Sequence, residues 1–236
     1  ELLMATDPDA DRLGVGVRDQ NGDYVLLNGN QTAALITYYL LESRKNNNSL
    51  DGNQMIVKTI VTSDLLVDIA NYYNVKSFDV LTGFKFIADI IRRYEGKLEF
   101  VCGGEESYGF LAGDFVRDKD ALLTACLIAE TASWAKSNNK TLIDLLLDIS
   151  FRFGLYREAL VSVTKKGISG MKEISDLMTK FRNNVPEFFA NARLIGCIDY
   201  EIQVHKDLIN SMKTQIDLPK SNIIQYVIAN GIKITM

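Results

Sequence analysis

The chain has 236 residues, and its 47% hydrophobic content is enough to bury the cores of one or two domains. The net charge is −4 with no dense Lys/Arg block, and no apolar run reaches membrane-spanning length or follows a signal-peptide pattern, so nucleic acid and membranes are not expected partners. Cys102, Cys126 and Cys197 lie far apart without paired spacing, which argues against disulfides or a cysteine zinc site and favours a cytoplasmic location.

The first residues predict short strands around an acidic loop. Leu2–Ala5 indicates the end of a strand, and Leu13–Val17 with Tyr24–Leu27 predicts a hairpin turned by Gln20–Asp23. The motif Asp7-Pro8-Asp9 therefore lies in a loop between strands. Because the first residue is not Met and this motif follows almost at once, we expect the chain to be a part of a longer polypeptide.

Strands and helices then alternate, which is typical of an α/β fold. The expected strands are Met55–Val61, Lys76–Leu81 and Leu98–Cys102, and the expected helices are Thr32–Ser43 (capped by Asn30), Leu65–Tyr73, Phe84–Tyr94 and Ala121–Asn138. This order predicts a mixed, largely parallel sheet with helices on both faces. Loops that bind ligands are expected at the carboxyl ends of its strands.

The remainder predicts the end of this domain and the beginning of another. The expected elements are helix Leu142–Phe153, strand Ala159–Val163, helix Met171–Asn183, and a hairpin of Asn222–Ile228 with Ile232–Met236 about Asn230-Gly231. We therefore expect residues 1–28 to end one domain, residues 29–190 to form a complete α/β domain, and residues 191–236 to be a linker and the truncated start of a third domain.

Asp7, Asp9 and Asp11 alternate along the acidic loop, so an extended loop would place all three carboxylates on one side. Their mutual repulsion favours a hard divalent cation between them, and Mg²⁺ is the usual partner of a phosphate substrate. Arg12 adds a planar guanidinium that suits phosphate oxygens.

Two other interpretations of the acidic loop stay open, and one is excluded. The loop could be a solvated acidic turn, or Asp7 could be the covalent nucleophile of a metal-dependent phosphatase. A Ca²⁺-binding EF-hand loop that begins at Asp7 would need Gly and Glu where this sequence has Arg12 and Arg18, so that interpretation fails.

The run Ala5-Thr6-Asp7-Pro8-Asp9-Ala10-Asp11-Arg12 resembles the metal loop of the α-D-phosphohexomutases, the phosphoglucomutase and phosphomannomutase family, and later motifs follow in the family's order. The resemblance covers essentially the whole chain. It implies the end of the second domain, all of the third and the start of the fourth. It also implies Mg²⁺ held by the three aspartates, next to a phosphoserine of the first domain that this chain lacks.

Gly103-Gly104-Glu105-Glu106-Ser107-Tyr108-Gly109 resembles the family's sugar loop, in which the positions of Glu105 and Ser107 contact ring hydroxyls. A carboxylate accepts from two hydroxyls, a serine both accepts and donates, and glycines let the backbone approach a ligand. Without the resemblance, the stretch is an ordinary Gly-rich turn. Its Glu-Glu-Ser form is more similar to phosphoglucomutases than to dual-specificity relatives.

Two further segments resemble substrate-facing loops of the family. Thr82-Gly83-Phe84-Lys85 resembles the loop that meets the reorienting substrate, so Thr82, Gly83 and Lys85 are candidate contacts; alone, the segment predicts an N-cap at Thr82 and a core residue at Phe84. Lys119, in Arg117-Asp118-Lys119-Asp120, matches the position near the reacting oxygen and is the candidate general acid or base, with a pKa lowered by burial and nearby cations. From composition alone, an exposed charged turn is favoured there.

The resemblance implies that the full-length protein is an isomerase-class phosphotransferase that interconverts hexose 1-phosphate and hexose 6-phosphate through a hexose bisphosphate. The chain alone is expected to be inactive, because its partners include the missing N- and C-terminal domains of the same polypeptide. A non-catalytic phosphosugar-binding module is the alternative, and a metal-dependent phosphatase is a weaker one. Glucose and mannose share the hydroxyls that one carboxylate and one serine recognise, so the choice of hexose stays open.

Overall fold

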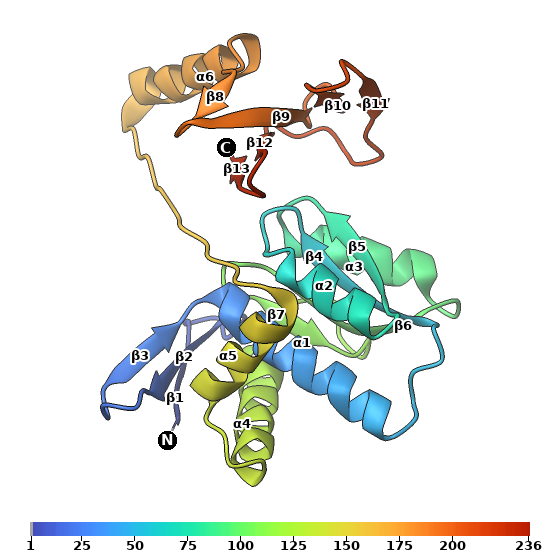
Figure 1. Cartoon of the computed structure of the whole chain (residues 1–236). Helices are drawn as coiled ribbons and strands as arrows, with labels where there is room; N and C mark the ends of the chain where they lie inside the picture. The colour runs from blue at the N-terminus through green and yellow to red at the C-terminus, as the bar shows by residue number, and fades with distance from the viewer. Residues whose placement is uncertain (1) are drawn as a thin grey trace. The chain divides into compact units, whose positions relative to one another are not determined.

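A computed structural model describes residues 2–236, and the chain divides into two compact units that meet in sequence between Glu158 and Ala159 (Figure 1). Each unit has its own hydrophobic core. None of the helices among residues 2–236 combines the length and the apolar character needed to cross a bilayer. The domain boundaries expected after residues 28 and 190 stay predictions.

The first unit begins with a three-stranded antiparallel sheet in the order β1-β2-β3, formed by β1 (Leu2–Thr6), β2 (Leu13–Arg18) and β3 (Tyr24–Leu27). Alternate residues of β2, among them Leu13 and Val15, are buried on the face that packs against helix α4 (Ala121–Ser137). The predicted strand and hairpin are therefore confirmed. The acidic loop connects β1 to β2.

The second sheet of this unit has four strands in the order β5-β4-β6-β7: β4 (Gln54–Thr59), β5 (Lys76–Val80), β6 (Glu99–Gly104) and β7 (Phe110–Ala112). β4 is parallel to β5 and β6, and β7 is antiparallel to β6. Every residue of β4 is buried: Met55 and Val57 pack toward helix α3 (Phe84–Tyr94), and Ile56 faces the other core of this unit.

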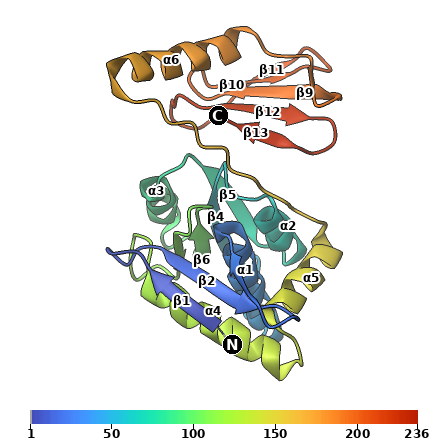
Figure 2. The same cartoon turned by 90° about the vertical axis from the view of Figure 1, so that its left-hand side faces the viewer.

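Helices cover both faces of this sheet, and α2 and α3 lie on opposite sides of it (Figure 2). The mixed, largely parallel α/β fold is therefore confirmed. The helices are α1 (Gly29–Asn46), α2 (Leu65–Tyr72), α3 (Phe84–Tyr94), α4 (Ala121–Ser137) and α5 (Leu142–Phe153).

Helix α1 starts earlier than expected, and Asn28 caps it in place of Asn30. The Asn28 side chain accepts from the Gln31 backbone at 2.8 Å, and the Gln31 side chain accepts from the Asn28 backbone at 2.9 Å. This reciprocal pair is a capping box, and the spacing Asn-x-x-Gln was its signal in the sequence. Asn30 is buried and instead accepts from the backbone N–H of Ser63 at 3.0 Å.

Replacing the capping residue, Asn28→Ala, is expected to lower the free energy of unfolding by about 1 kcal/mol, because the backbone N–H of Gln31 in the first turn of α1 loses its acceptor. Urea denaturation followed by far-UV circular dichroism measures the change. The matched control is Asn46→Ala at the exposed last turn of α1, which should change stability by less than about 0.5 kcal/mol. Equal losses in both variants would contradict the capping role.

The second unit packs a helix, α6 (Gly167–Asn183), against an antiparallel sheet in the order β11-β10-β9-β12-β13, with β8 paired to β9. The hairpin about Gly231 is confirmed as β12 and β13. The strand expected at Ala159–Val163 is wrong: these residues are exposed and pair with no strand among residues 2–236. The strands are β8 (Phe188–Phe189), β9 (Ala192–Asp199), β10 (Val204–Asp207), β11 (Lys213–Gln215), β12 (Ile224–Ile228) and β13 (Lys233–Thr235).

All three cysteines are free thiols, and only Cys126 is exposed. Burial raises the pKa of Cys102 to about 12 and also raises that of Cys197. Since the thiolate is the reactive form, one thiol of three should react rapidly with Ellman's reagent at pH 8, and Cys126→Ser should remove that phase. Rapid reaction of a second thiol in the folded chain would contradict this burial.

Candidate functional site

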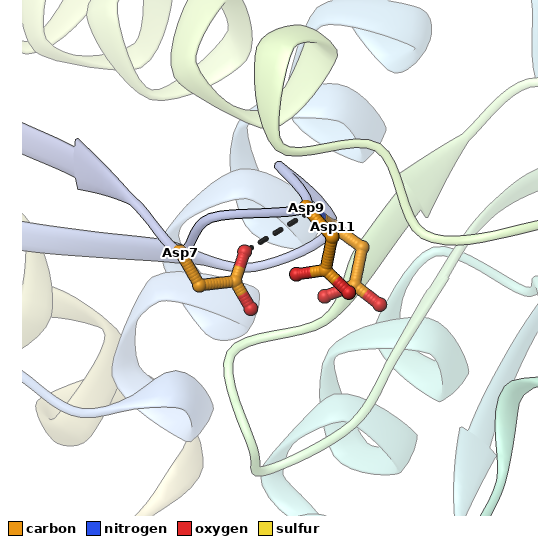
Figure 3. Close-up of side chains that lie close together, drawn as sticks. All are labelled: Asp7, Asp9 and Asp11. Carbon is orange, nitrogen blue, oxygen red and sulfur yellow. Dashed lines mark hydrogen bonds between the residues drawn. The ribbon is translucent and has the colours of Figure 1, made fainter.

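The acidic loop between β1 and β2 folds back on itself and gathers its carboxylates. The backbone N–H of Ala10, which has a φ of 56°, donates to the Asp7 carbonyl at 3.0 Å. Asp7 Oδ1 then accepts from the backbone N–H groups of Asp11 at 3.2 Å and Arg12 at 3.1 Å. One carboxylate oxygen from each of Asp7, Asp9 and Asp11 lies within 4.8 Å of the others, and the three groups face one another (Figure 3).

Two cations flank these carboxylates. Arg12 Nε lies 3.6 Å from Asp11 Oδ1 and 4.0 Å from Asp7 Oδ2, and Lys119 Nζ lies 3.0 Å from Asp11 Oδ2. Partial burial tends to raise the pKa of Asp7, but backbone N–H groups of Arg12 and Asp11 outweigh it and lower that pKa. Asp7 is therefore held in its charged form.

Asp11 Oδ1 is buried and accepts no hydrogen bond from the described residues. A buried carboxylate oxygen without such a partner is unusual, and a bound cation would satisfy it. Three hard oxygen donors of this kind fit Mg²⁺, which takes carboxylates together with phosphate oxygens and water. The residues present therefore fit the expected metal.

The Gly-rich segment from Gly103 to Gly109, which we call the sugar loop, follows β6 at the carboxyl end of the parallel strands. The loop is closed by a hydrogen bond from the Glu105 N–H to the Gly109 carbonyl at 2.8 Å. Glu105 is only 7% exposed, and its Oε1 accepts from the Gly83 N–H at 2.9 Å. Ser107 is half-buried in the same loop. The hydrogen bond to Gly83 thus links the Glu105 carboxylate of the sugar loop to the segment Thr82–Lys85.

The acidic loop, the sugar loop and Lys119 meet. Arg12 and Gly109 form an antiparallel bridge, and the backbone N–H of Leu13 donates to the Tyr108 carbonyl at 3.3 Å. A Cβ atom on Gly109 would lie 2.1 Å from Lys119 Cδ and 3.3 Å from Glu105 Oε2. The aliphatic part of the Lys119 side chain therefore packs directly on Gly109, and its Nζ reaches Asp11 beside the Glu105 carboxylate. A side chain at position 109 would prevent this close approach, so glycine is needed there.

The segment Thr82–Lys85 lies at the start of helix α3. Gly83, with a φ of 115°, is the N-cap of α3, so the N-cap expected at Thr82 is wrong; Phe84 is a core residue, as predicted. Thr82 and Lys85 are exposed, and Lys85 Nζ lies 5.0 Å from the ring centroid of Phe86. Their proximity to a substrate stays a prediction.

The lowered pKa expected for Lys119 is wrong for this arrangement. Burial does tend to lower the pKa, but Asp11 and then Asp118 raise it above the usual lysine value. Lys119 Nζ lies 3.0 Å from Asp11 and 3.4 Å from Asp118, and 5.4 Å from the ring centroid of Phe84. The neighbouring charges are carboxylates rather than the expected cations, and they hold the ammonium in its protonated form.

The sequence interpretation missed the polar cluster beneath the sugar loop. Lys58, in an otherwise mostly apolar strand, is 1% exposed, with its Nζ 3.0 Å from Asp64 Oδ1 and 3.1 Å from Asp79 Oδ1. Thr59 and Thr62 follow it and contact Glu106. A lysine within a fully buried strand was the signal, because such a charge needs partners close by.

Comparison with known proteins agrees with this fold. The family described as phosphoglucomutase/phosphomannomutase, alpha/beta/alpha domain III, matches residues 28–150, more than half of the chain. The chain belongs to this phosphoglucomutase/phosphomannomutase family. A phosphoglucomutase of Staphylococcus aureus is 40% identical over 231 residues, and one of Staphylococcus epidermidis is 39% identical; the alignments cover 98% of this chain but 41% and 42% of those proteins. The chain thus spans about two fifths of these curated relatives.

Solved structures support the fold independently. The phosphoglucomutase pp63/parafusin from Paramecium, in its open form, superposes with a TM-score of 0.61 at 19% identity, covering 98% of this chain and 37% of that one. A phosphoglucomutase/phosphomannomutase family protein from Burkholderia thailandensis gives a TM-score of 0.51 at 16% identity over 82% of this chain and 36% of its own. At these identities the likeness concerns the fold alone.

Proposed function

We propose that the whole protein containing this chain interconverts hexose 1-phosphate and hexose 6-phosphate through a hexose bisphosphate, with a phosphoserine supplied from outside this chain. The observation that carries the proposal is the meeting of three elements in one unit: the Asp7–Asp9–Asp11 cluster, the sugar loop and Lys119. Family membership supports this reaction class.

The acidic loop and its cations are assigned to the phosphoryl group. Asp7, Asp9 and Asp11 would hold Mg²⁺, which when bound neutralises charge on the phosphoryl group in transfer. The exposed guanidinium of Arg12 offers a planar pair of donors to phosphate oxygens. Lys119 Nζ, kept protonated by Asp11, holds the proton that is passed to and from the hexose oxygen.

The sugar loop is assigned to the hexose. Gly83 fixes Glu105 Oε1, so Oε2 is the oxygen left to accept from sugar hydroxyls, and Ser107 adds a group that both donates and accepts. Thr82 and Lys85 at the start of α3 are exposed and are assigned to the hydroxyls and phosphate of the reorienting intermediate. These contacts recognise hydroxyls that glucose and mannose share, so the hexose is not fixed by them.

The test compares the whole protein with this chain alone, using glucose 1-phosphate, glucose 1,6-bisphosphate and Mg²⁺. Glucose 6-phosphate should form only with the whole protein, because this chain contains no match to the family's nucleophilic serine loop. Release of inorganic phosphate by the chain alone would favour a phosphatase. Sugar phosphate binding by the whole protein without turnover, on any hexose phosphate tried, would favour a binding module.

A further inference from the structure

Glu106 lies next to Glu105 in the sugar loop but contacts a different part of the fold. Its Oε2 accepts from the hydroxyls of Thr59 at 3.1 Å and Thr62 at 3.3 Å, whereas Glu105 contacts Gly83. The two threonine oxygens are 2.8 Å apart, and both side chains are almost completely buried. Each threonine hydroxyl has one proton to donate, whereas a carboxylate oxygen only accepts. Glu106 is therefore the acceptor for this pair of hydroxyls.

Hydrogen bonds also hold the backbone of the two threonines. Lys58 Nζ donates to the Thr62 carbonyl at 3.1 Å and to the Thr59 carbonyl at 3.3 Å, and the Thr62 N–H donates to the Thr59 carbonyl at 3.1 Å. The Thr62 hydroxyl also lies 3.4 Å from the Gly104 carbonyl. The turn at the end of β4 is therefore a fixed support that reaches the sugar loop at two places.

The backbone of Glu106 is confined on its other side by helix α1. A Cβ atom on Gly29 would lie 2.2 Å from the Glu106 carbonyl oxygen and 2.8 Å from the Tyr108 nitrogen. The backbone of Glu106 therefore packs closely against α1, and its side chain is hydrogen-bonded to the turn at the end of β4. Glu105 and Ser107 are the chain neighbours of Glu106, so the same contacts determine where their backbone lies.

We propose that Glu106 is a positioning residue: it fixes Glu105 and Ser107 for the hexose by binding Thr59 and Thr62, and does not itself contact substrate. This inference rests on the proposed function. It assigns the Thr59–Thr62 turn and the second glutamate of the Glu-Glu-Ser motif a common role in sugar recognition.

The test uses the whole protein. Glu106→Ala is expected to lower kcat/KM for hexose phosphate by about 10- to 100-fold, with the larger share in KM, because a small misplacement of binding groups has effects of this size. Mg²⁺ affinity measured by calorimetry should not change. The double variant Thr59→Val/Thr62→Val should lose about as much, and the triple variant no more than either, because all three side chains act through one contact. Glu106→Gln keeps an acceptor oxygen and should recover most of the activity.

The matched control is Glu99→Gln at the opposite end of β6, where the carboxylate is also hydrogen-bonded, to Arg44 and Gln54. The kcat/KM of this control variant should equal that of the unchanged protein. Multiplicative losses in the triple variant would overturn the inference while leaving the mutase reaction in place. Absence of turnover in the unchanged protein would instead reject the proposed function.

Amide hydrogen exchange of residues 104–109 tests the inference without turnover. Exchange should be faster in Glu106→Ala and in the threonine double variant, but not in Glu99→Gln. Equal protection of this segment in all four proteins would overturn the positioning role.

Discussion

Replacing Asp11 by asparagine is expected to lower the mutase kcat/KM of the whole protein by roughly 10³-fold, because a bound divalent cation contributes several kcal/mol to phosphoryl transfer. The Asp11 carboxylate has two functions that the neutral amide of asparagine does not replace. Its buried Oδ1 accepts no hydrogen bond from the described residues and is available to a cation, and its Oδ2 lies 3.0 Å from Lys119 Nζ. Isothermal titration with Mg²⁺ measures the loss of metal affinity, and a coupled assay measures the loss of mutase turnover, both on the same preparation.

The matched control is Asp23→Asn, which makes the same charge change in the turn of the β2–β3 hairpin. It should leave Mg²⁺ affinity and turnover unchanged. Asp9→Ala should weaken Mg²⁺ binding as Asp11→Asn does, since Asp9 provides one of the three gathered oxygens. Unchanged Mg²⁺ affinity in both the Asp9 and the Asp11 variants would reject the metal site.

The elements that the sequence predicted well are those whose pattern is local. Phe84–Tyr94 is a helix with the predicted bounds, because its apolar residues recur at helical spacing and Gly83 precedes it. β7 and the strands β8 to β11 were not predicted. Four of them have only two to four residues, and strands this short are defined by their partners rather than by their own residues, whereas β9 has eight residues and its apolar pattern was overlooked. Ala159–Val163 shows the converse: its composition is typical of a strand, but in the described part of the chain it pairs with no strand.

The same division holds for the candidate site. The grouping of Asp7, Asp9 and Asp11 follows from their spacing in one loop, so it could be predicted from the sequence. The direction of the Lys119 pKa could not, because it depends on Asp11, which lies far away in the sequence, in the loop between β1 and β2. The anchoring of Glu106 similarly needs the register of β4 against β6, which places Thr59 and Thr62 beneath the sugar loop.

Replacing Lys58 by methionine is expected to lower the free energy of unfolding of the first unit by about 3 kcal/mol, although methionine has nearly the same length and volume. The variant leaves Asp64 and Asp79 without the ammonium that lies 3.0 and 3.1 Å from them, and it removes the donor to the Thr59 and Thr62 carbonyls. We place the loss at the lower end for a broken buried ion pair, because both aspartates are partly exposed and water can reach them. Urea denaturation measures this loss.

The control for the lysine variant is Lys76→Met on β5, an exposed lysine of the same sheet, which should change stability by less than about 0.5 kcal/mol. Adding Asp79→Asn to Lys58→Met should recover part of the loss, because the double variant removes one of the two carboxylates that lose their contact with the ammonium. If Lys58→Met were as stable as the unchanged protein, the buried ammonium would have no net role in holding β4 to β5. The support beneath the sugar loop would then have to come from the threonine hydroxyls and their hydrogen bonds to Glu106 alone.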